Sequence, residues 1–208
     1  MGEEGSSSLR QIAVLASGRG SNFQALIDAT RSGYIPAAIT RLITDNPEAY
    51  AIRRAKDAGI PVSVLDFGSF PGKGAYEEAL KAEMEECDPD LFILAGYMRI
   101  LPSAIVRAFP GRIMNIHPAL LPSFPGLHAQ RQALEYGVKV SGCTVHFVDE
   151  GTDTGPIIIQ RCIPVEEGDD EEALSVRILV EEHRVLTEAV RLFCEGKIRL
   201  FGRRVFIR

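Results

Sequence analysis

The 208-residue sequence lacks several features that would assign it to particular classes of protein. Its four cysteines are widely separated and form no C-x-x-C pair, so we expect a reducing, cytoplasmic location and neither a zinc site nor disulfides. No apolar run approaches the roughly eighteen residues that suggest a membrane span. The net charge is −5 and no dense Lys/Arg stripe is present, which argues against nucleic acid as a partner.

The start of the chain also lacks the pattern of a signal peptide. Residues 1–9 are mostly small, polar and acidic, with no basic segment followed by an apolar one, and we expect them to form a disordered tail. The sequence as a whole is 46% hydrophobic, which suffices for one full core. No repeat or linker divides the chain, so we expect a single domain.

Short apolar runs alternate with amphipathic helical segments through the first half of the chain. Strands that alternate with helices at this spacing predict a parallel, Rossmann-like α/β sheet. The predicted strands are 11–16, 37–44, 60–65, 90–95 and 112–117.

The pattern changes after residue 117. Segments 141–149 and 157–165 look like an antiparallel pair, and a long helix is predicted at 171–195. Segment 200–207 is predicted to add a final edge strand. The sheet is therefore expected to be mixed, with antiparallel strands in the second half.

An Asn-x-His-Pro sequence closes the fifth predicted strand. Because alternate side chains of a strand share a face, Asn115 and His117 are expected to point the same way, while Ile116 packs on the other side. Pro118 cannot continue a central strand, so the pair lies beside a turn. An amide can stabilise an oxyanion and an imidazole can transfer a proton. This strand end is the main candidate for a catalytic site.

Other polar residues are weaker candidates. Asp153 lies in a glycine-rich loop, where ordinary turn chemistry would explain it, but the loop could also bring its carboxylate to His117 and raise the imidazole pKa. His128 begins a predicted helix and is a rival ligand contact. His146 alternates with apolar residues, which favours a packed sheet histidine. Glu182 lies on the long helix, where a solvated face is the default.

The loop 18–22 joins the first strand to a helix. Backbone N–H groups and the helix dipole favour an anion there, although a plain turn is the alternative. The nucleotide motifs are incomplete, because Phe23 replaces the third glycine of a dinucleotide fingerprint and no lysine follows the second glycine. Asp45 lies at the end of the second predicted strand, where a ribose-binding acid would sit, so a dinucleotide remains an alternative ligand. We favour the phosphate of a smaller ligand, held by Gly20, Ser21 and Asn22.

A second loop, Met98-Arg99-Ile100-Leu101, follows the fourth predicted strand. Its apolar side chains are equally compatible with a pocket for an apolar ring and with core packing.

Four segments match one known family in order and spacing. They are 12–22 (IAVLASGRGSN), 95–102 (AGYMRILP), 115–128 (NIHPALLPSFPGLH) and 141–156 (SGCTVHFVDEGTDTGP). On these segments, the chain from about residue 11 to about residue 195 resembles the glycinamide ribonucleotide formyltransferases, folate-dependent enzymes of purine synthesis. The pattern NIHP-x-LLP-x-x-PG is specific to formyl-folate enzymes, and SGRGSN and GLHA point to the glycinamide members.

The resemblance implies transfer of a formyl group from the co-substrate 10-formyltetrahydrofolate to the amino group of glycinamide ribonucleotide, with no metal. It also implies one formyltransferase domain, in which residues 10–110 hold the nucleotide and residues 111–208 hold folate and the catalytic groups. The implied catalytic residues are Asn115, His117 and Asp153. The implied ribonucleotide-binding residues are Gly20, Ser21, Asn22, Phe23, Gln24 and Glu182. The implied folate-binding residues are Lys73, Met98, Arg99, Ile100, Leu101, Asn115, Asp149, Glu150, Gly151, Thr152 and Asp153, with Lys73 near the place where the family often has arginine.

In the mechanism that follows, the Asn115 amide and protonated His117 stabilise charge on the formyl oxygen. His117, tuned by Asp153, then carries a proton toward folate N10. Three alternatives remain. One is a methionyl-tRNA formyltransferase, which is expected to have a further basic domain, and another is a formyltetrahydrofolate hydrolase, which is expected to have an N-terminal regulatory domain. The third is a non-catalytic nucleotide-binding module. A monomer and a homodimer are both compatible with the sequence.

Overall fold

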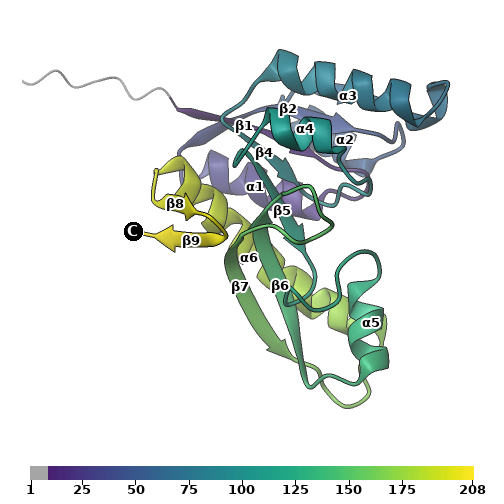
Figure 1. The fold of residues 1–208 in the computed structure, drawn as a ribbon, viewed down its shortest axis with the longest axis vertical. Helices are drawn as coiled ribbons and strands as arrows, with labels where there is room; N and C mark the ends of the chain where they lie inside the picture. The colour runs from purple at the N-terminus through teal and green to yellow at the C-terminus, as the bar shows by residue number, and fades with distance from the viewer. Residues whose placement is uncertain (1–8) are drawn as a thin grey trace, which may run out of the picture.

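The computed structural model describes residues 9–208, so the predicted tail lies, apart from Leu9, outside the described residues. Seven strands form one sheet in the order β3-β2-β1-β4-β5-β6-β7 (Figure 1). The first five pair in parallel, and β6 and β7 are antiparallel. This mixed α/β sheet confirms the predicted fold class. The strands are β1 Arg10–Leu15, β2 Ala37–Thr44, β3 Val62–Val64, β4 Leu91–Leu94, β5 Ile113–His117, β6 Val140–Phe147 and β7 Ile157–Pro164.

Helices cover both faces of the sheet and form two separate cores. One core joins the sheet to α1, α2 and the long α6, and the other joins it to α3 and α4 (Figure 1). Within residues 9–208, no helix is long and apolar enough to cross a bilayer. The helices are α1 Ser21–Arg31, α2 Tyr50–Ala58, α3 Lys73–Cys87, α4 Ser103–Ala108, α5 Ala129–Tyr136 and α6 Glu171–Cys194, with a short 3-10 helix at Phe67–Ser69.

Residues 12–15 of β1 and all of β4 are apolar without interruption because both faces of these strands are covered. In β1, Ile12 and Val14 pack toward α1 and α6, whereas Ala13 and Leu15 pack toward α3 and α4. Period-two alternation of polar residues is therefore absent from this strand, as expected for a parallel strand between two helical layers.

Strand β5 lies where the sheet changes from parallel to antiparallel. It pairs in parallel with β4 and antiparallel with β6. Met114 and Ile116 belong to the core on the α6 side, and Ile113 belongs to the core on the α3 side. By the same alternation, Asn115 and His117 face the α3 side, which confirms that they share a face.

The predicted edge strand at 200–207 is wrong. The segment forms a separate hairpin of β8 Ile198–Phe201 and β9 Arg204–Ile207, outside the main sheet. Gly202 has φ +58° in the two-residue turn, a conformation that short hairpins need and glycine adopts readily. This glycine between two short strand-like runs was the signal for a hairpin.

Candidate active site

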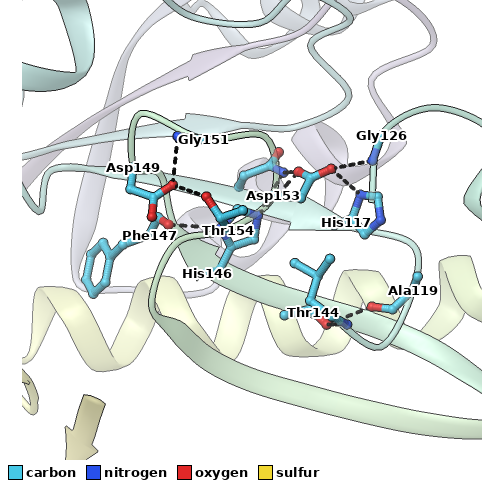
Figure 2. A network of polar contacts seen from close by, with 12 residues as sticks. His117, Ala119, Gly126, Thr144, His146, Phe147, Asp149, Gly151, Asp153 and Thr154 are labelled. Carbon is cyan, nitrogen blue, oxygen red and sulfur yellow. Dashed lines mark hydrogen bonds and ion pairs between the residues drawn. The ribbon is translucent and has the colours of Figure 1, made fainter. Parts of the chain in front are cut away.

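The three expected catalytic side chains meet at the end of β5, and Figure 2 shows Asp153 beside His117. His117 Nδ1 lies 3.3 Å from Asp153 Oδ2, and the Asn115 amide donates to Asp153 Oδ1 at 3.4 Å. The His117 and Asp153 side chains are 5% and 13% exposed. The predicted approach of the Asp153 carboxylate to His117 is therefore confirmed.

The loop between β6 and β7 carries Asp153, which has φ +54°. Aspartate enters this left-handed region more readily than most residues. The Gly126 N–H donates to Asp153 Oδ2 at 2.8 Å, which connects the loop after His117 to the loop that carries the carboxylate. The carboxylate is therefore fixed from two directions.

The same loop is closed by bonds to Asp149. Its Oδ1 accepts from the Gly151 N–H at 3.1 Å and from the Thr154 hydroxyl at 2.5 Å (Figure 2). A Cβ on Gly155 would lie 1.7 Å from the Phe147 carbonyl oxygen, so only glycine fits where the loop rejoins the sheet. These contacts explain the Asp-Gly-rich composition of the segment in physical terms.

The hydrogen bonds of His117 constrain its protonation. Nε2 donates to the Phe124 carbonyl at 2.8 Å, so this nitrogen carries a proton. Nδ1 faces the Asp153 carboxylate, which favours a second proton there. Burial has the larger effect and lowers the His117 pKa below its ordinary value, whereas Asp153 and the Phe124 carbonyl raise it. The expectation of a raised pKa is corrected: the carboxylate acts in the predicted direction, but burial outweighs it.

Asp153 stays ionised in this setting. Burial alone raises its pKa, but contacts with His146, the Gly126 N–H and His117 outweigh burial and hold the pKa below its ordinary value. The site therefore pairs a fixed carboxylate with an imidazole whose charged form is disfavoured until another anion approaches.

His146 is a residue of the site that sequence analysis assigned to plain packing. It is opposite Asn115 in the β5–β6 register, and its Nε2 lies 3.1 Å from the Asn115 amide nitrogen. Nδ1 donates to the Phe147 carbonyl at 2.9 Å, which leaves Nε2 to accept from Asn115. Alternation correctly placed His146 on a strand. Alternation does not predict the register between β5 and β6, and that register is what places the His146 ring beside the Asn115 amide.

A pocket of about 280 Å³ opens in front of these side chains. Most of the expected folate-binding residues line it. They are Met98, Arg99, Ile100, Leu101, Asn115, Asp149, Gly151, Thr152 and Asp153. Met98 and Ile100 are 63% and 71% exposed, which favours their role as pocket walls over the core packing that was equally open.

Two expected folate contacts do not line this pocket. Lys73 is the first residue of α3, its side chain is 77% exposed, and its ammonium lies 3.4 Å from Glu77. The Glu150 carboxylate turns to Arg107 on α4, at 2.6 Å. The structure thus separates these two side chains from the rest of the predicted set.

Arg99 belongs to an ordered cluster at the rim of the pocket. Its Nε donates to Asp45 Oδ2 at 2.6 Å, and its guanidinium lies 3.5 Å from the ring centroid of Phe67. Asp45, kept open as a ribose-binding acid, is thus buried and paired with Arg99. This pair removes most of the support for the dinucleotide alternative.

The glycine loop begins α1. Gly20 has φ +66°, and a Cβ there would lie 2.9 Å from the Cβ of Ala51. Ser21 is the first helical residue, so backbone N–H groups face the loop. Phe23 is fully buried in the core, which rules out ligand contact by its side chain. Gln24 bonds instead to neighbouring side chains.

Asn22 connects this loop to the long helix. Its Nδ2 donates to Glu182 Oε2 at 2.8 Å, across 160 residues of sequence. Glu182 is 8% exposed, so the default of a solvated face is wrong for it. Burial raises the Glu182 pKa, and the Asn22 hydrogen bond opposes that effect. Within residues 9–208, Asn22 Oδ1 is buried without a hydrogen-bond partner, so this pair retains an unused acceptor.

Comparison with known proteins agrees with this geometry. A family model described as "Formyl transferase" matches residues 10–190, so the chain belongs to the formyl transferase family. The phosphoribosylglycinamide formyltransferase of Escherichia coli K12 is 40% identical, over 91% of this chain and 89% of its own length. The crystal structure of glycinamide ribonucleotide transformylase 1 from Symbiobacterium toebii is 51% identical, with a TM-score of 0.92 over 96% of this chain and 94% of that one.

A longer relative matches as well. The trifunctional purine biosynthetic protein adenosine-3 of Drosophila melanogaster is 47% identical over 90% of this chain. The chain spans only 14% of that protein's length. The similarity therefore covers one section of a much larger polypeptide.

Proposed function

We propose that this chain transfers the formyl group of 10-formyltetrahydrofolate to the amino group of glycinamide ribonucleotide, in de novo purine biosynthesis. The observation that carries the proposal is the approach of Asn115, His117 and Asp153 at the end of β5, in front of a largely apolar pocket. A relative of nearly the same length bears the name of this activity. The ribonucleotide and the formyl-folate are its small-molecule partners.

The Asn115 amide is the proposed donor to the formyl oxygen. One of its N–H groups is held by His146 Nε2 at 3.1 Å, and the other reaches Asp153 only at 3.4 Å. The longer bond is the weaker one, so that N–H is the group available to an oxyanion. His146 keeps the Asn115 amide oriented while its other N–H moves from Asp153 to the oxyanion. This division of the two N–H groups suits a tetrahedral intermediate.

His117 is the proposed proton carrier. When the amine attacks the formyl carbon, negative charge develops on the formyl oxygen beside a ring that already faces Asp153. Two anions then oppose the burial effect and favour the imidazolium. His117 can take the proton released by the new amide nitrogen and return it to folate N10, the leaving group. The proton balance is closed within the site.

The pocket and the glycine loop are proposed to bind different substrates, the formyl-folate and the ribonucleotide respectively. Residues 98–101 and 149–153 are proposed to hold the pterin, with Lys73 and Glu150 as folate contacts outside the pocket lining. The backbone of residues Gly20 to Gln24 is proposed to hold the phosphate, and Glu182 is proposed to contact another part of the ribonucleotide. The Ser17 hydroxyl accepts from the Met98 N–H at 2.9 Å, which links the two regions directly.

An acceptor competition tests the function. The protein is incubated with 10-formyltetrahydrofolate and offered glycinamide ribonucleotide, initiator methionyl-tRNA or water, and tetrahydrofolate release and the formylated product are measured. We expect turnover with the ribonucleotide alone, and a loss of about 10²- to 10⁴-fold in kcat for His117→Ala. Turnover with water alone would assign a hydrolase, and tight NAD binding without turnover would assign a nucleotide-binding module.

The remaining parts of the proposal concern the cell and the assembly. The four cysteines, all within residues 9–208, are free thiols, in keeping with a reducing cytoplasm. Sedimentation of the purified protein distinguishes a monomer from a homodimer.

A further inference from the structure

The loop that carries Asp153 is also held from outside by the C-terminal hairpin. Arg203, in the turn between β8 and β9, donates from Nη2 to the Thr154 carbonyl at 2.7 Å. Its Nη1 lies 4.0 Å from Asp149 Oδ2. One guanidinium therefore contacts both ends of the segment 149–154. One of these contacts is with Thr154, the residue next to Asp153.

The hairpin provides a fixed support for this contact. Ile198 and Val205, one from each of its strands, pack against the core on the α6 side. The Arg208 N–H donates to the Lys197 carbonyl at 3.0 Å, which closes the base of the hairpin. Strand β9 also contacts β7, the strand that leaves the loop (Figure 1). Arg203 is thus carried by a hairpin whose own packing does not involve the 149–155 loop.

The bonds within this loop are local, so its position over the pocket depends on contacts from other segments. The bonds from Gly151 and Thr154 to Asp149 fix its shape but not its position over the pocket. The Gly126 N–H holds the Asp153 carboxylate, and that donor comes from another loop. Arg107 holds Glu150 from the α4 side. The contact with Arg203 ties the remaining side of the loop to the body of the protein.

We propose that Arg203 is a positioning residue that holds the 149–155 loop over the pocket, so that Asp153 stays beside His117 and the loop keeps its place as a wall of the formyl-folate site. This inference rests on the proposed function. Arg203 is 74% exposed, does not line the pocket and touches no reacting group. It acts through the Thr154 backbone and the Asp149 carboxylate.

The test is Arg203→Ala, with steady-state kinetics for both substrates. Losing a charged donor to a backbone carbonyl frees the loop, so we expect kcat/KM for formyl-folate to fall about threefold to tenfold. The KM for formyl-folate rises and kcat falls, while the KM for the ribonucleotide stays unchanged because the glycine loop is not touched. Arg203→Lys keeps a cation near Asp149 and a donor for Thr154, and it recovers most of the loss.

The matched control is Arg204→Ala, one residue along the same hairpin. Arg204 lies over the Phe206 ring and makes no polar contact with the 149–155 loop within the described residues. A general loss of folding would lower kcat in both variants without raising the KM for formyl-folate. Wild-type kinetics for Arg203→Ala, or equal effects of the two substitutions, would overturn the proposal.

Hydrogen exchange separates this inference from the proposed function. In Arg203→Ala, backbone amides of residues 149–155 are expected to exchange faster, while those of β1 and α1 are unchanged. This readout needs no substrate. If the wild type is inactive but the loop exchanges faster in the variant, the proposed function is refuted and the positioning role of Arg203 is supported. Unchanged exchange in the variant would refute the positioning role of Arg203.

Discussion

Removing the negative charge of Asp153 is the most informative perturbation of the site. Asp153→Asn keeps the size of the side chain, and asparagine accepts the φ of +54° as readily as aspartate does. The amide oxygen can still accept from Gly126. The substitution therefore changes the charge beside His117 while the loop keeps its backbone conformation.

The size of the effect follows from the distance between the two groups. Unit charges 3.3 Å apart attract by about 5 kcal/mol at an effective dielectric constant of about 20. Partial exposure of Asp153 reduces this figure, and we expect the imidazolium in the transition state to lose about 3 to 5 kcal/mol. That loss corresponds to a fall in kcat of about 10²- to 10⁴-fold.

The assay measures formation of tetrahydrofolate at saturating concentrations of both substrates. Asp57→Asn, the same change at a 74% exposed position on α2, is the matched control and should retain wild-type turnover. Thermal unfolding shows whether the variant is folded. A folded Asp153→Asn protein with kcat within about threefold of wild type would refute the assignment of the carboxylate as the partner of His117.

Three further substitutions or conditions test the structure at separate places. The lowered pKa of His117 means that the unfolded chain binds more protons below pH 6.5, so the free energy of unfolding should fall as pH drops from 7 to 5, and urea titrations of His117→Gln should show a weaker dependence. Burial raises the pKa of Glu182, so its charge is unfavourable at pH 7; Glu182→Gln should stabilise by about 1 kcal/mol in thermal unfolding, while affinity for the ribonucleotide, measured by calorimetry, falls. If Glu182→Gln lowers stability, its bond to Asn22 matters more than its burial. Gly155→Ala should destabilise by about 3 kcal/mol or prevent folding, whereas Gly74→Ala, with open space around it, should be neutral or stabilising in the same urea titration.

The sequence contained enough information for the parallel half of the sheet. The buried parts of β1 and β4 are apolar on both faces, and amphipathic helices lie between the strands, so the pattern favours a parallel sheet between two helical layers. The shared face of Asn115 and His117 followed from strand geometry alone. The sequence does not predict the 198–207 hairpin clearly because its exposed side chains show little periodicity. Gly202 in the turn is the main residue that indicates it.

Contacts between distant segments set the limit of prediction at the site. His146 was assigned to packing because its partner depends on the register of β5 against β6. The balance of effects on the His117 pKa required its burial, which no local pattern reports. Lys73 was placed by analogy with an arginine, but the start of α3 directs it to Glu77. The outcomes at His146 and His117 are decided by tertiary structure, whereas the Lys73–Glu77 pair is a local i,i+4 contact within α3.

The position of β5 within the sheet makes the active site depend on contacts between distant parts of the chain. Its parallel neighbour β4 precedes it, its antiparallel neighbour β6 follows it, and Asp153 comes later still, 38 residues beyond Asn115. Parallel strands joined through helices and a distant hairpin are non-local contacts, which form slowly. During refolding, enzymatic activity should therefore return after the helical signal has recovered. Time-resolved activity thus reports the formation of the non-local contacts around β5.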